Sequence, residues 1–542
     1  MQGQTASSLD TTSVKKTGIN LFERFKTVFS IDLRSLALFR IGLGLILLVD
    51  LAVKSFDLRE FYTDQGVLPR HAWLEVSNQW HWSLHSMSGQ TPLIVLLFLL
   101  AAVAAVALLA GFHSRFAAIV CWVLTVSLTN RNGHILQGGD NLLCVLCFWS
   151  MFLPLGKRWS VDAYKRVKKL QIRGVNNNEP QQAFSIATIA VILQVLYLYF
   201  FTALLKTGAP WRETFDAAFY AVSLQHFVTP IGAFFLDYPG FLKFGTAFVM
   251  VVELVAPLLV LSLYFQLPLR LLGVALLYSL HISFLLMLHI GLFPLIDFVA
   301  LTLLLPGAIW LVFGRIQSRV KSLFARSNNT SAAMASEPHE QISTSHDKSG
   351  LSWRTGVAGS AAILMQLIAA YYLYVITYTN IIGLNSNNWK APTHVNIAKS
   401  VARIDQRWDM FAPFPLTYSL YPQIEGTLRD GTKVNLLDGS VSEPVNELPE
   451  FMYDTYQGYR WRKYLSRVHS NSSNTIRSQY GSYLCKHWNK PDRPYLQQLG
   501  TADLKFIRLH TNTERVEKKR DTRQVWQHWC YPEFKPAEKE NS

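Results

Sequence analysis

The feature that most constrains this chain is a run of 20 residues without a charge. Residues Pro92–Gly111 read PLIVLLFLLAAVAAVALLAG. A helix of ~20 residues rises ~30 Å, which is the thickness of the hydrocarbon core of a bilayer. A helix in a soluble core would show a polar face, and this run shows none. The run therefore predicts a helix that crosses a membrane.

Further apolar runs predict that the chain crosses the membrane about nine times. The predicted fold is an all-α polytopic membrane bundle of about nine transmembrane helices, followed by a C-terminal α+β extracytoplasmic domain that contains a β-hairpin. The basic N-terminal region 1–30 is polar and lacks the pattern of a cleaved signal peptide, so we expect disorder there and a first helix that remains as an anchor. The expected spans are 34–52, 92–111, 114–130, 140–156, 184–205, 241–265, 268–289, 291–313 and 355–382.

Basic residues between these runs predict the orientation. Lys157–Arg173 holds seven Lys and Arg residues against one Asp, and Arg315–Arg326 holds four basic residues and no acid. With nine spans, both segments and the basic N-terminus fall on one side, which the positive-inside rule assigns to the cytoplasm. The net charge of +15 then reflects topology in a cell (inner) membrane. No nucleic-acid motif accompanies the charge, so nucleic acid is not an expected partner.

The apolar pattern also predicts the domain organisation. Residues 31–315 form the main transmembrane domain, 316–354 a flexible cytoplasmic linker, and 355–383 the final transmembrane helix. From residue 384 to 542 the apolar blocks stop, which predicts a soluble domain outside the cell.

Three local patterns describe this last domain. Asp430-Gly431 lies between two strand-like stretches, and Asp-Gly supplies the positive φ angles of a tight hairpin turn. Short helices are expected near 447–465 and 472–489. Cys485 and Cys530 lie on the oxidising side and are candidates for a disulfide bond.

Polar residues at membrane depth are the candidates for function, because their burial is costly. Arg40 lies nearly two turns into the first helix. We expect it to face the protein interior and to find a carboxylate or a bound anion. The alternative is a long side chain that reaches back to the lipid headgroups.

The connection after the third span is dense in hydrogen-bonding groups and glycines. Asn130, Asn132, His134 and Asp140 lie in it and are candidates for lining a substrate or quinol pocket. An ordinary exposed loop is the alternative, since clusters of Gly and Asn are also plain turn signals.

Lys206 ends the fifth span, and Trp211 follows five residues later. A lysine at a helix end is most often an anchor at the lipid headgroups. The functional alternative is a buried lysine that desolvation keeps neutral, and which can therefore act as a base.

Glu253 lies in the middle of the sixth span, and His281 lies near the end of the seventh. An unpaired carboxylate at this depth would be costly, so Glu253 is expected either to pair or to take up a proton. A histidine near a membrane interface is equally often structural. Walker loops, metalloprotease motifs and zinc-type Cys/His spacing are absent from the sequence, and no metal site is expected.

These residues resemble the horizontally transferred transmembrane (HTTM) family, whose best-known members are the vitamin K-dependent γ-glutamyl carboxylases. The similarity extends over roughly residues 30–315. Four stretches carry it: Asp32–Leu51, Trp159-Ser160-Val161-Asp162, Lys206 with Trp211, and His281 followed by Ile290-Gly291-x-Phe293.

The resemblance implies a reaction and its cofactor. Such carboxylases oxygenate reduced vitamin K, and the strong base so formed removes a γ-proton from a glutamate, to which CO₂ then adds. Lys206 would be the base that deprotonates the quinol, and His281 would be the family histidine. The cofactor would be reduced vitamin K or another membrane quinol. The partners would be the lipid bilayer, that quinol and a glutamate-containing protein or peptide.

The sequence departs from the animal enzymes at one important place. They carry Asn-His shortly before the Trp-Ser-Val-Asp stretch, where this chain has Gly139 and Asp140. Two other functions therefore stay open. One is a non-catalytic membrane protein whose exported domain binds a partner, and the other is a transporter with Arg40, Glu253 and His281 along a substrate path. An enzyme requires Lys206, His281 and the Asn130–Asn141 connection to meet at one pocket.

Overall fold

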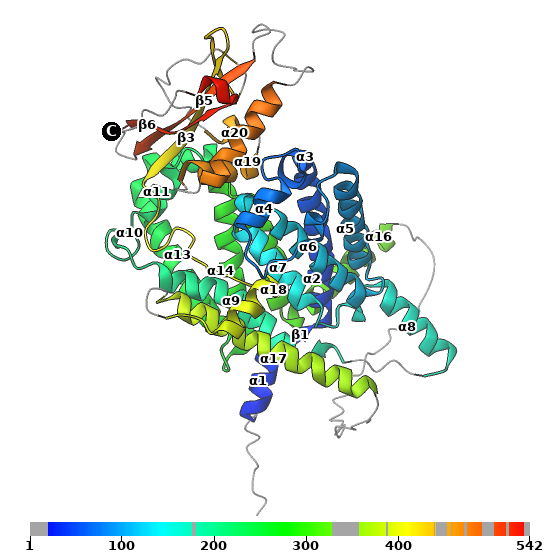
Figure 1. Ribbon diagram of the computed structural model, residues 1–542. Coiled ribbons are helices and arrows are strands. Elements are labelled where there is room, and N and C mark those ends of the chain that lie inside the picture. Colours follow the sequence, from blue (N-terminus) through cyan, green and yellow to red (C-terminus); the bar gives the residue numbers. More distant parts are fainter. Residues whose placement is uncertain are drawn as a thin grey trace, which may run out of the picture.

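The computed structural model is mostly helical, with a small sheet domain at one end of a helical bundle (Figure 1). It describes residues 20–175, 180–327, 357–385, 389–437, 440, 452–456, 458–470, 474–489, 503–515 and 520–535. The predicted disorder before residue 20 and most of the predicted linker lie outside these residues. The shorter helices are α1 (Leu21–Phe29), α3 (Leu58–Tyr62), α4 (Arg70–Val76), α8 (Val161–Ile172), α10 (Ala209–Arg212), α11 (Ala217–Ser223), α12 (Pro230–Phe234) and the 3₁₀ turns η1 (Leu84–Ser86), η2 (Gly133–Ile135), η3 (Leu155–Lys157), η4 (Phe235–Asp237), η6 (Met452–Thr455) and η7 (Pro532–Phe534).

In the described part of the chain, six helices are long and apolar enough to cross a membrane. A seventh candidate is a pair bent by 95°, formed by Phe293–Leu304 and Gly307–Arg319. The chain is therefore a multi-pass membrane protein. The six helices are α2 (Leu33–Ser55), α5 (Thr91–Ala110), α9 (Ile186–Leu205), α13 (Pro239–Val260), α14 (Gln266–Met287) and most of α17 (Val357–Gly383); the bent pair comprises α15 (Phe293–Leu301) with η5 (Thr302–Leu304), and α16 (Gly307–Ser327).

The predicted count of nine spans is not confirmed by these six or seven helices. The two further predicted spans correspond to α6 (Ser114–Arg131) and α7 (Gly138–Ser150). With 13 residues α7 is about 20 Å long, which is shorter than a bilayer core. Of these residues 11 are buried, so α7 packs against protein rather than lipid. A helix enclosed in this way needs neither the length nor the uniform hydropathy of a lipid-facing span.

The two ends of α2 contact different parts of the molecule. At its start, Arg34 pairs with Asp32 and donates to the carbonyl of Gly307, where α16 begins. The short strand β1 (Ile31–Asp32) pairs there with β2 (Gln182–Ala183). The C-terminal sheet domain packs at the opposite end of the bundle (Figure 1).

The C-terminal domain is a four-stranded antiparallel sheet with two helices. The sheet order is β4-β3-β5-β6. Gly431, with a φ of 90°, lies in the turn between β3 and β4, so the predicted hairpin is confirmed. The elements are β3 (Tyr418–Leu428), β4 (Lys433–Asn435), β5 (Leu504–Arg515), β6 (Arg520–Trp529), α19 (Tyr459–Ser470) and α20 (Asn474–Trp488).

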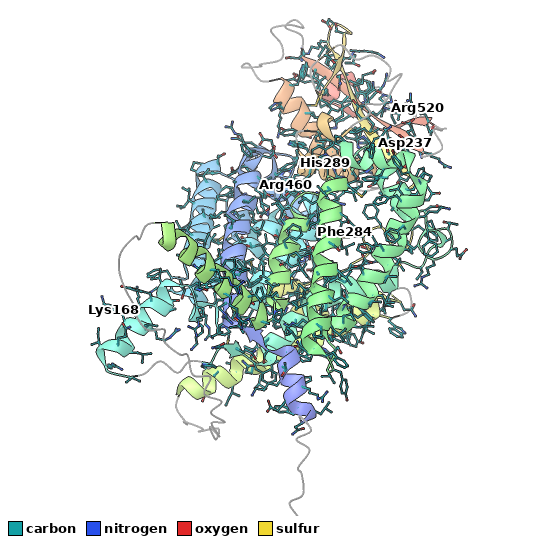
Figure 2. All side chains as sticks on the ribbon, turned by 180° about the vertical axis from the view of Figure 1, so that it is seen from behind. Lys168, Asp237, Phe284, His289, Arg460 and Arg520 are labelled. Atoms are coloured by element: carbon teal, nitrogen blue, oxygen red, sulfur yellow. A yellow bond between two sulfur atoms is a disulfide. The ribbon has the colours of Figure 1, made fainter. Side chains whose placement is uncertain are left out.

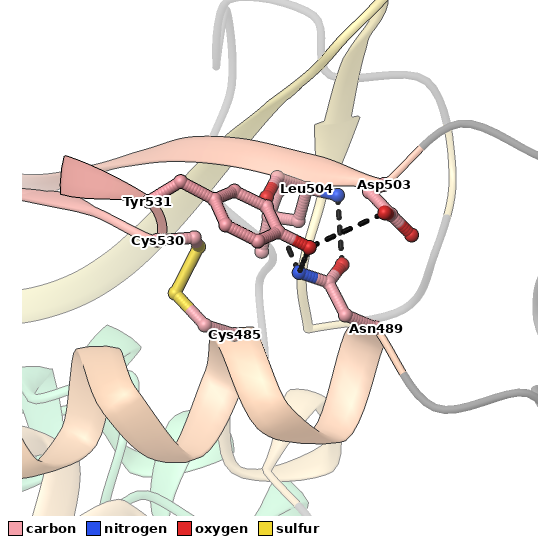
Figure 3. Close-up of a disulfide and its surroundings, with 6 residues drawn as sticks. All are labelled: Cys485, Asn489, Asp503, Leu504, Cys530 and Tyr531. Atoms are coloured by element: carbon pink, nitrogen blue, oxygen red, sulfur yellow. Dashed lines mark hydrogen bonds between the residues drawn. A yellow bond between two sulfur atoms is a disulfide. The ribbon is translucent and has the colours of Figure 1, made fainter. Parts of the chain in front are cut away.

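A disulfide bond between Cys485 and Cys530 ties α20 to the end of β6 (Figure 3). Asn489, which directly follows the last residue of α20, accepts a hydrogen bond from the backbone N–H of Leu504 at 2.8 Å. The hydroxyl of Tyr531 donates to Asp503 at 3.2 Å. The disulfide and these hydrogen bonds fix helix and sheet together at one place.

The chain from α18 (Thr393–Ala402) to Trp408 packs into the bundle. Ile404 and Trp408 belong to the same buried core as the transmembrane helices. The indole N–H of Trp82 donates to the carbonyl of Val401, and the amides of Gln194 and Gln406 bind each other at 2.7 and 2.9 Å. The sequence pattern assigned all of 384–542 to a soluble domain and did not indicate this return into the bundle.

Four buried charges join the bundle to the C-terminal domain. Arg460 of α19 lies 2.7 Å from Asp50 and 3.3 Å from Asp140, and Lys54 lies 2.5 Å from Asp50 and 3.4 Å from Asp140. Burial alone would lower the pKa of Arg460, but the carboxylate of Asp140 and its neighbours raise this pKa above its ordinary value. The two cations and two anions balance, and Arg460 stays charged.

We expect removal of the disulfide to loosen the C-terminal domain. Closing a loop between residues 45 apart restricts the unfolded chain, and the double variant Cys485→Ala, Cys530→Ala should lose about 4 kcal/mol by loop entropy. Thermal unfolding of the purified protein with and without reductant would measure the loss. The buried thiol variant Cys121→Ser is the control and should keep its response to reductant. An unchanged melting temperature in the double variant would contradict the expectation.

We expect Arg460→Met to cost about 3–5 kcal/mol, because it leaves two buried carboxylates with a single lysine. The paired variant Arg460→Met, Asp140→Asn removes one charge of each sign and should recover most of the loss. Chemical denaturation of the three proteins would measure both effects. If the paired variant is no more stable than Arg460→Met, charge balance is not what holds this joint together.

Candidate functional site

The side chains of Lys206 and Glu253 form a buried ion pair. Helix α9 ends at Leu205, and Lys206 is its C-cap residue. The Nζ of Lys206 lies 2.7 Å from both carboxylate oxygens of Glu253 in α13, and these side chains are only 3% and 5% exposed. Glu253 thus has the partner that its depth requires, and Lys206 is not an anchor at the lipid headgroups. An amine and a carboxylate are thus in direct contact where little water reaches them.

The ring of Trp211 covers Lys206, and residues from the C-terminal half of the chain bind Trp211 and Gly208 beside it. The Nζ of Lys206 lies 4.2 Å from the ring centroid of Trp211, whose indole N–H donates to the carbonyl of Phe411 at 2.9 Å. The N–H of Gly208 donates to the carbonyl of Pro413 at 3.1 Å. A Cβ at Gly208 would lie 2.7 Å from that carbonyl oxygen, so the close approach requires glycine.

A second buried polar group surrounds His281. The hydroxyl of Tyr199 donates to Asp297 at 3.3 Å, so its oxygen can accept the Nε2–H of His281 at 2.9 Å. This direction leaves Nδ1 of His281 as a hydrogen-bond acceptor. In the described part of the chain, neither this Nδ1 nor Oδ2 of Asp297 has a hydrogen-bond partner.

Helix α9 connects these two groups. Tyr199 and Lys206 are seven residues apart, or about two turns, and therefore share one face of the helix at a spacing of about 10 Å along its axis. Sequence reasoning did not single out Tyr199 or Asp297. A signal for Asp297 was available, because it is an acidic residue inside the apolar run Phe293–Leu304.

The predicted loop residues belong mainly to the packing of loops at the C-terminal-domain end of the bundle. The amide of Asn130 donates to the carbonyl of Trp82, and the amide of Asn132 donates to that of Phe61. His134 donates its backbone N–H to Asn132. Asp140 alone of the four joins the cluster with Arg460.

Two small cavities lie on either side of this charge cluster. One lies between α2, α5 and α6, and its lining includes Asp50, Lys54 and Cys121. The other combines polar groups with an apolar wall that includes Phe293, whose ring centroid lies 5.8 Å from that of His281. Its lining residues are Asp50, Gln137, Gly139, Asp140, Leu143, Ile290, Leu292, Phe293, Ile296 and Tyr459.

Arg40 lies elsewhere and has backbone partners. Its guanidinium is buried and donates to the carbonyls of Leu155, Arg158 and Trp159. Its hydrogen-bond partners are thus carbonyl oxygens, where the sequence had suggested a carboxylate or a bound anion.

The candidate residues therefore form three buried polar groups. Lys206 pairs with Glu253, His281 bonds Tyr199, and Asp140 joins the charges around Arg460. Neither of the two cavities is lined by Lys206 or His281. Among the described residues, no cluster of three or more His, Cys, Asp or Glu side chains could hold a metal ion.

Comparison with known proteins places the chain in a family. No curated protein and no solved structure matches it. The HTTM domain matches residues 29–308, which is just over half of the chain and includes all three polar groups except Arg460. The protein belongs to the HTTM domain family.

Proposed function

We propose that this protein is a membrane enzyme that uses a membrane quinol, with Lys206 as the base that takes a proton from a quinol hydroxyl. The observation that carries the proposal is the buried pair of Lys206 and Glu253. When the proton of the pair resides on Glu253, the amine of Lys206 holds a free lone pair. Proton transfer from the quinol then gives a quinol anion and the Lys206 ammonium, which stabilise each other as an ion pair while Glu253 keeps its proton.

The surroundings of the pair suit this chemistry. Both side chains are buried, and Trp211 covers the amine. Exclusion of water strengthens electrostatic interactions and protects a reactive carbanion from protons. A lipid-soluble quinol can reach such a site from the bilayer, whereas a water-soluble substrate would have to cross the covering segment.

The cavity beside Asp140 is our candidate for the quinol ring; Lys206 does not line it, so proton transfer to Lys206 requires a rearrangement that brings the quinol hydroxyl to the amine. The rings of Phe293 and Tyr459 offer flat apolar contact, and the amide of Gln137 and the carboxylate of Asp140 can bind hydroxyl groups. One segment connects this cavity to Lys206. A Cβ at Gly138 would lie 3.4 Å from the sulfur of Met410, and the next residue, Phe411, accepts the hydrogen bond of Trp211.

The reaction that the family resemblance implies is quinol-dependent carboxylation of a glutamate in a protein or peptide. His281 would then orient the substrate or stabilise developing charge through Nδ1, which the bond to Tyr199 leaves as an acceptor. Asp140 stands where the animal carboxylases have their Asn-His pair, so the group that faces the quinol differs in this chain.

We also propose the nine-span topology, with the N-terminus in the cytoplasm of the cell (inner) membrane and the C-terminal domain outside. The contacts of α6 support this count. Asp162, in the basic segment, accepts hydrogen bonds from Ser114 at the start of α6, whereas Arg467 of the C-terminal domain donates to Gly133 just beyond its end. Helix α6 therefore extends between the same two ends of the bundle as α2.

Cysteines introduced at Ser331 and Ser440 should react with a membrane-impermeant maleimide from opposite sides. Right-side-out and inverted vesicles would measure the accessibility of each site, since the five native cysteines are buried or disulfide-bonded in the structure. Labelling of both sites in the same vesicle orientation would contradict nine spans.

We expect Lys206→Met to abolish quinol oxidation, because methionine fills the space but accepts no proton. Oxidation of menadiol or phylloquinol by the purified protein, together with CO₂ incorporation into a glutamate peptide, would measure the loss. The control Lys243→Met removes a lysine that is 58% exposed and should leave activity unchanged.

The same substitution also leaves Glu253 buried without its cationic partner, which can destabilise the fold. Loss of folding must therefore be separated from loss of the base. The double variant Lys206→Met, Glu253→Gln leaves no charge at this pair and should unfold at a temperature close to that of the wild type. If this folded double variant oxidises quinol at the wild-type rate, Lys206 is not a base. The exported domain as a partner-binding module would then be the better interpretation.

A further inference from the structure

Helix α8 (Val161–Ile172) has no buried residue. It extends sideways from the bundle near the end that carries α1, and Lys168 lies on this extension (Figures 1 and 2). A helix of 12 residues that packs so little against its own chain is short of stabilising contacts. The rest of the molecule covers α8 only in part: Ala163, Val167 and Leu170 are half-buried, and no residue of the helix is fully enclosed.

The sequence of α8 is divided between two faces. Ala163, Val167 and Leu170 follow the spacing i, i+4, i+7 and share one face. Lys165, Lys168 and Lys169 share the opposite face, on which Val161 and Ile172 also lie. Apolar side chains also remain open to the outside: Tyr164 is 68% and Ile172 78% exposed. This division is typical of helices that lie in the plane of a membrane surface.

The charge of the segment is not balanced within it. Residues Lys157–Arg173 carry seven basic side chains and one acid, Asp162. The carboxylate of Asp162 is engaged at the start of α6, where it accepts hydrogen bonds from the backbone of His113 and from the backbone and hydroxyl of Ser114. No carboxylate of the segment is left to face the lysines.

The residues around the start of α8 place it at the level of a membrane surface. Trp159 is 52% exposed, and its ring meets that of Trp310 edge-on at 5.2 Å. Tryptophan rings prefer the boundary between hydrocarbon and headgroups. The Nζ of Lys165 lies 4.6 Å from the ring of Phe112, which directly follows the end of the apolar helix α5.

We propose that α8 lies on the membrane surface and binds the phosphate groups of anionic lipids through Lys165, Lys168 and Lys169. Its apolar face, together with Tyr164, rests on the acyl boundary of the bilayer. This binding site is separate from the proposed quinol chemistry and does not depend on it. The favourable interaction with an anionic surface provides the stabilisation that the protein interior does not give.

A single fluorescent reporter can test the proposal in the full-length protein. Tyr164→Cys introduces one exposed thiol, because Cys121, Cys144 and Cys147 are buried and the remaining two cysteines are paired. The labelled protein is placed in nanodiscs of phosphatidylcholine that contain increasing fractions of phosphatidylglycerol. We expect an environment-sensitive dye at this position to shift to the blue as the anionic fraction rises, and the shift to disappear in 1 M NaCl.

Substitution of the three lysines separates charge recognition from simple proximity. Lys165→Gln, Lys168→Gln and Lys169→Gln together should weaken the affinity for phosphatidylglycerol on the order of a hundredfold, about fivefold for each lysine. The matched control Lys243→Gln, Lys433→Gln, Lys505→Gln removes the same charge outside α8 and should keep the wild-type response.

Three results would overturn the proposal. The first is an equal dye shift in pure phosphatidylcholine, and the second is a triple α8 variant that responds like the wild type. The third is an RNA oligonucleotide that produces the shift in pure phosphatidylcholine and competes with phosphatidylglycerol, which would assign the basic face to nucleic acid instead.

Discussion

A charge buried in the low dielectric of the interior requires a neighbouring charge of opposite sign. The contact between the bundle and the C-terminal domain at Arg460 depends on this constraint. A guanidinium from the C-terminal domain lies against Asp50 and Asp140, with Lys54 completing a neutral set of four. None of these groups could be buried alone. The ion pairs between them therefore fix the distance between the C-terminal domain and the end of α2.

Neighbouring contacts follow from that position. The indole N–H of Trp461 reaches Asp57 at 2.9 Å, and Arg467 donates to the carbonyls of Gly133 and Leu136. The connection after α6 is thereby held between the bundle and α19, although it is rich in glycine and asparagine. The cavity beside Asp140 has Tyr459 as part of its wall, so its shape also depends on this docking.

The sequence allowed prediction of those features that depend on local composition. Twenty uncharged residues at Pro92–Gly111 required a spanning helix, and Asp430-Gly431 required a tight turn. The depth of Glu253 required a partner, because an isolated carboxylate in hydrocarbon is costly. The sequence could not identify that partner as Lys206, since nothing local relates residues 47 positions apart.

Features that depend on long-range packing could not be predicted. Arg460 and Asp50 are 410 positions apart, and an arginine in a polar helix resembles any solvated residue. Protein encloses α7, which the sequence does not reveal, so its apolar run was predicted to be an ordinary span. The amphipathic pattern of α18 is equally compatible with a soluble domain, and only the packing of Ile404 and Trp408 shows where it lies.

This return of the chain into the bundle changes how the C-terminal half relates to Lys206. The carbonyls of Phe411 and Pro413 accept hydrogen bonds from Trp211 and Gly208, so the chain beyond α17 packs against the residues that follow Lys206. The same half of the chain is also bound to the bundle by Arg460, which pairs with Asp50 and Asp140. The C-terminal half of the chain thus contributes to both places: Tyr459 lines the cavity beside Asp140, and Phe411 and Pro413 hold the residues that follow Lys206.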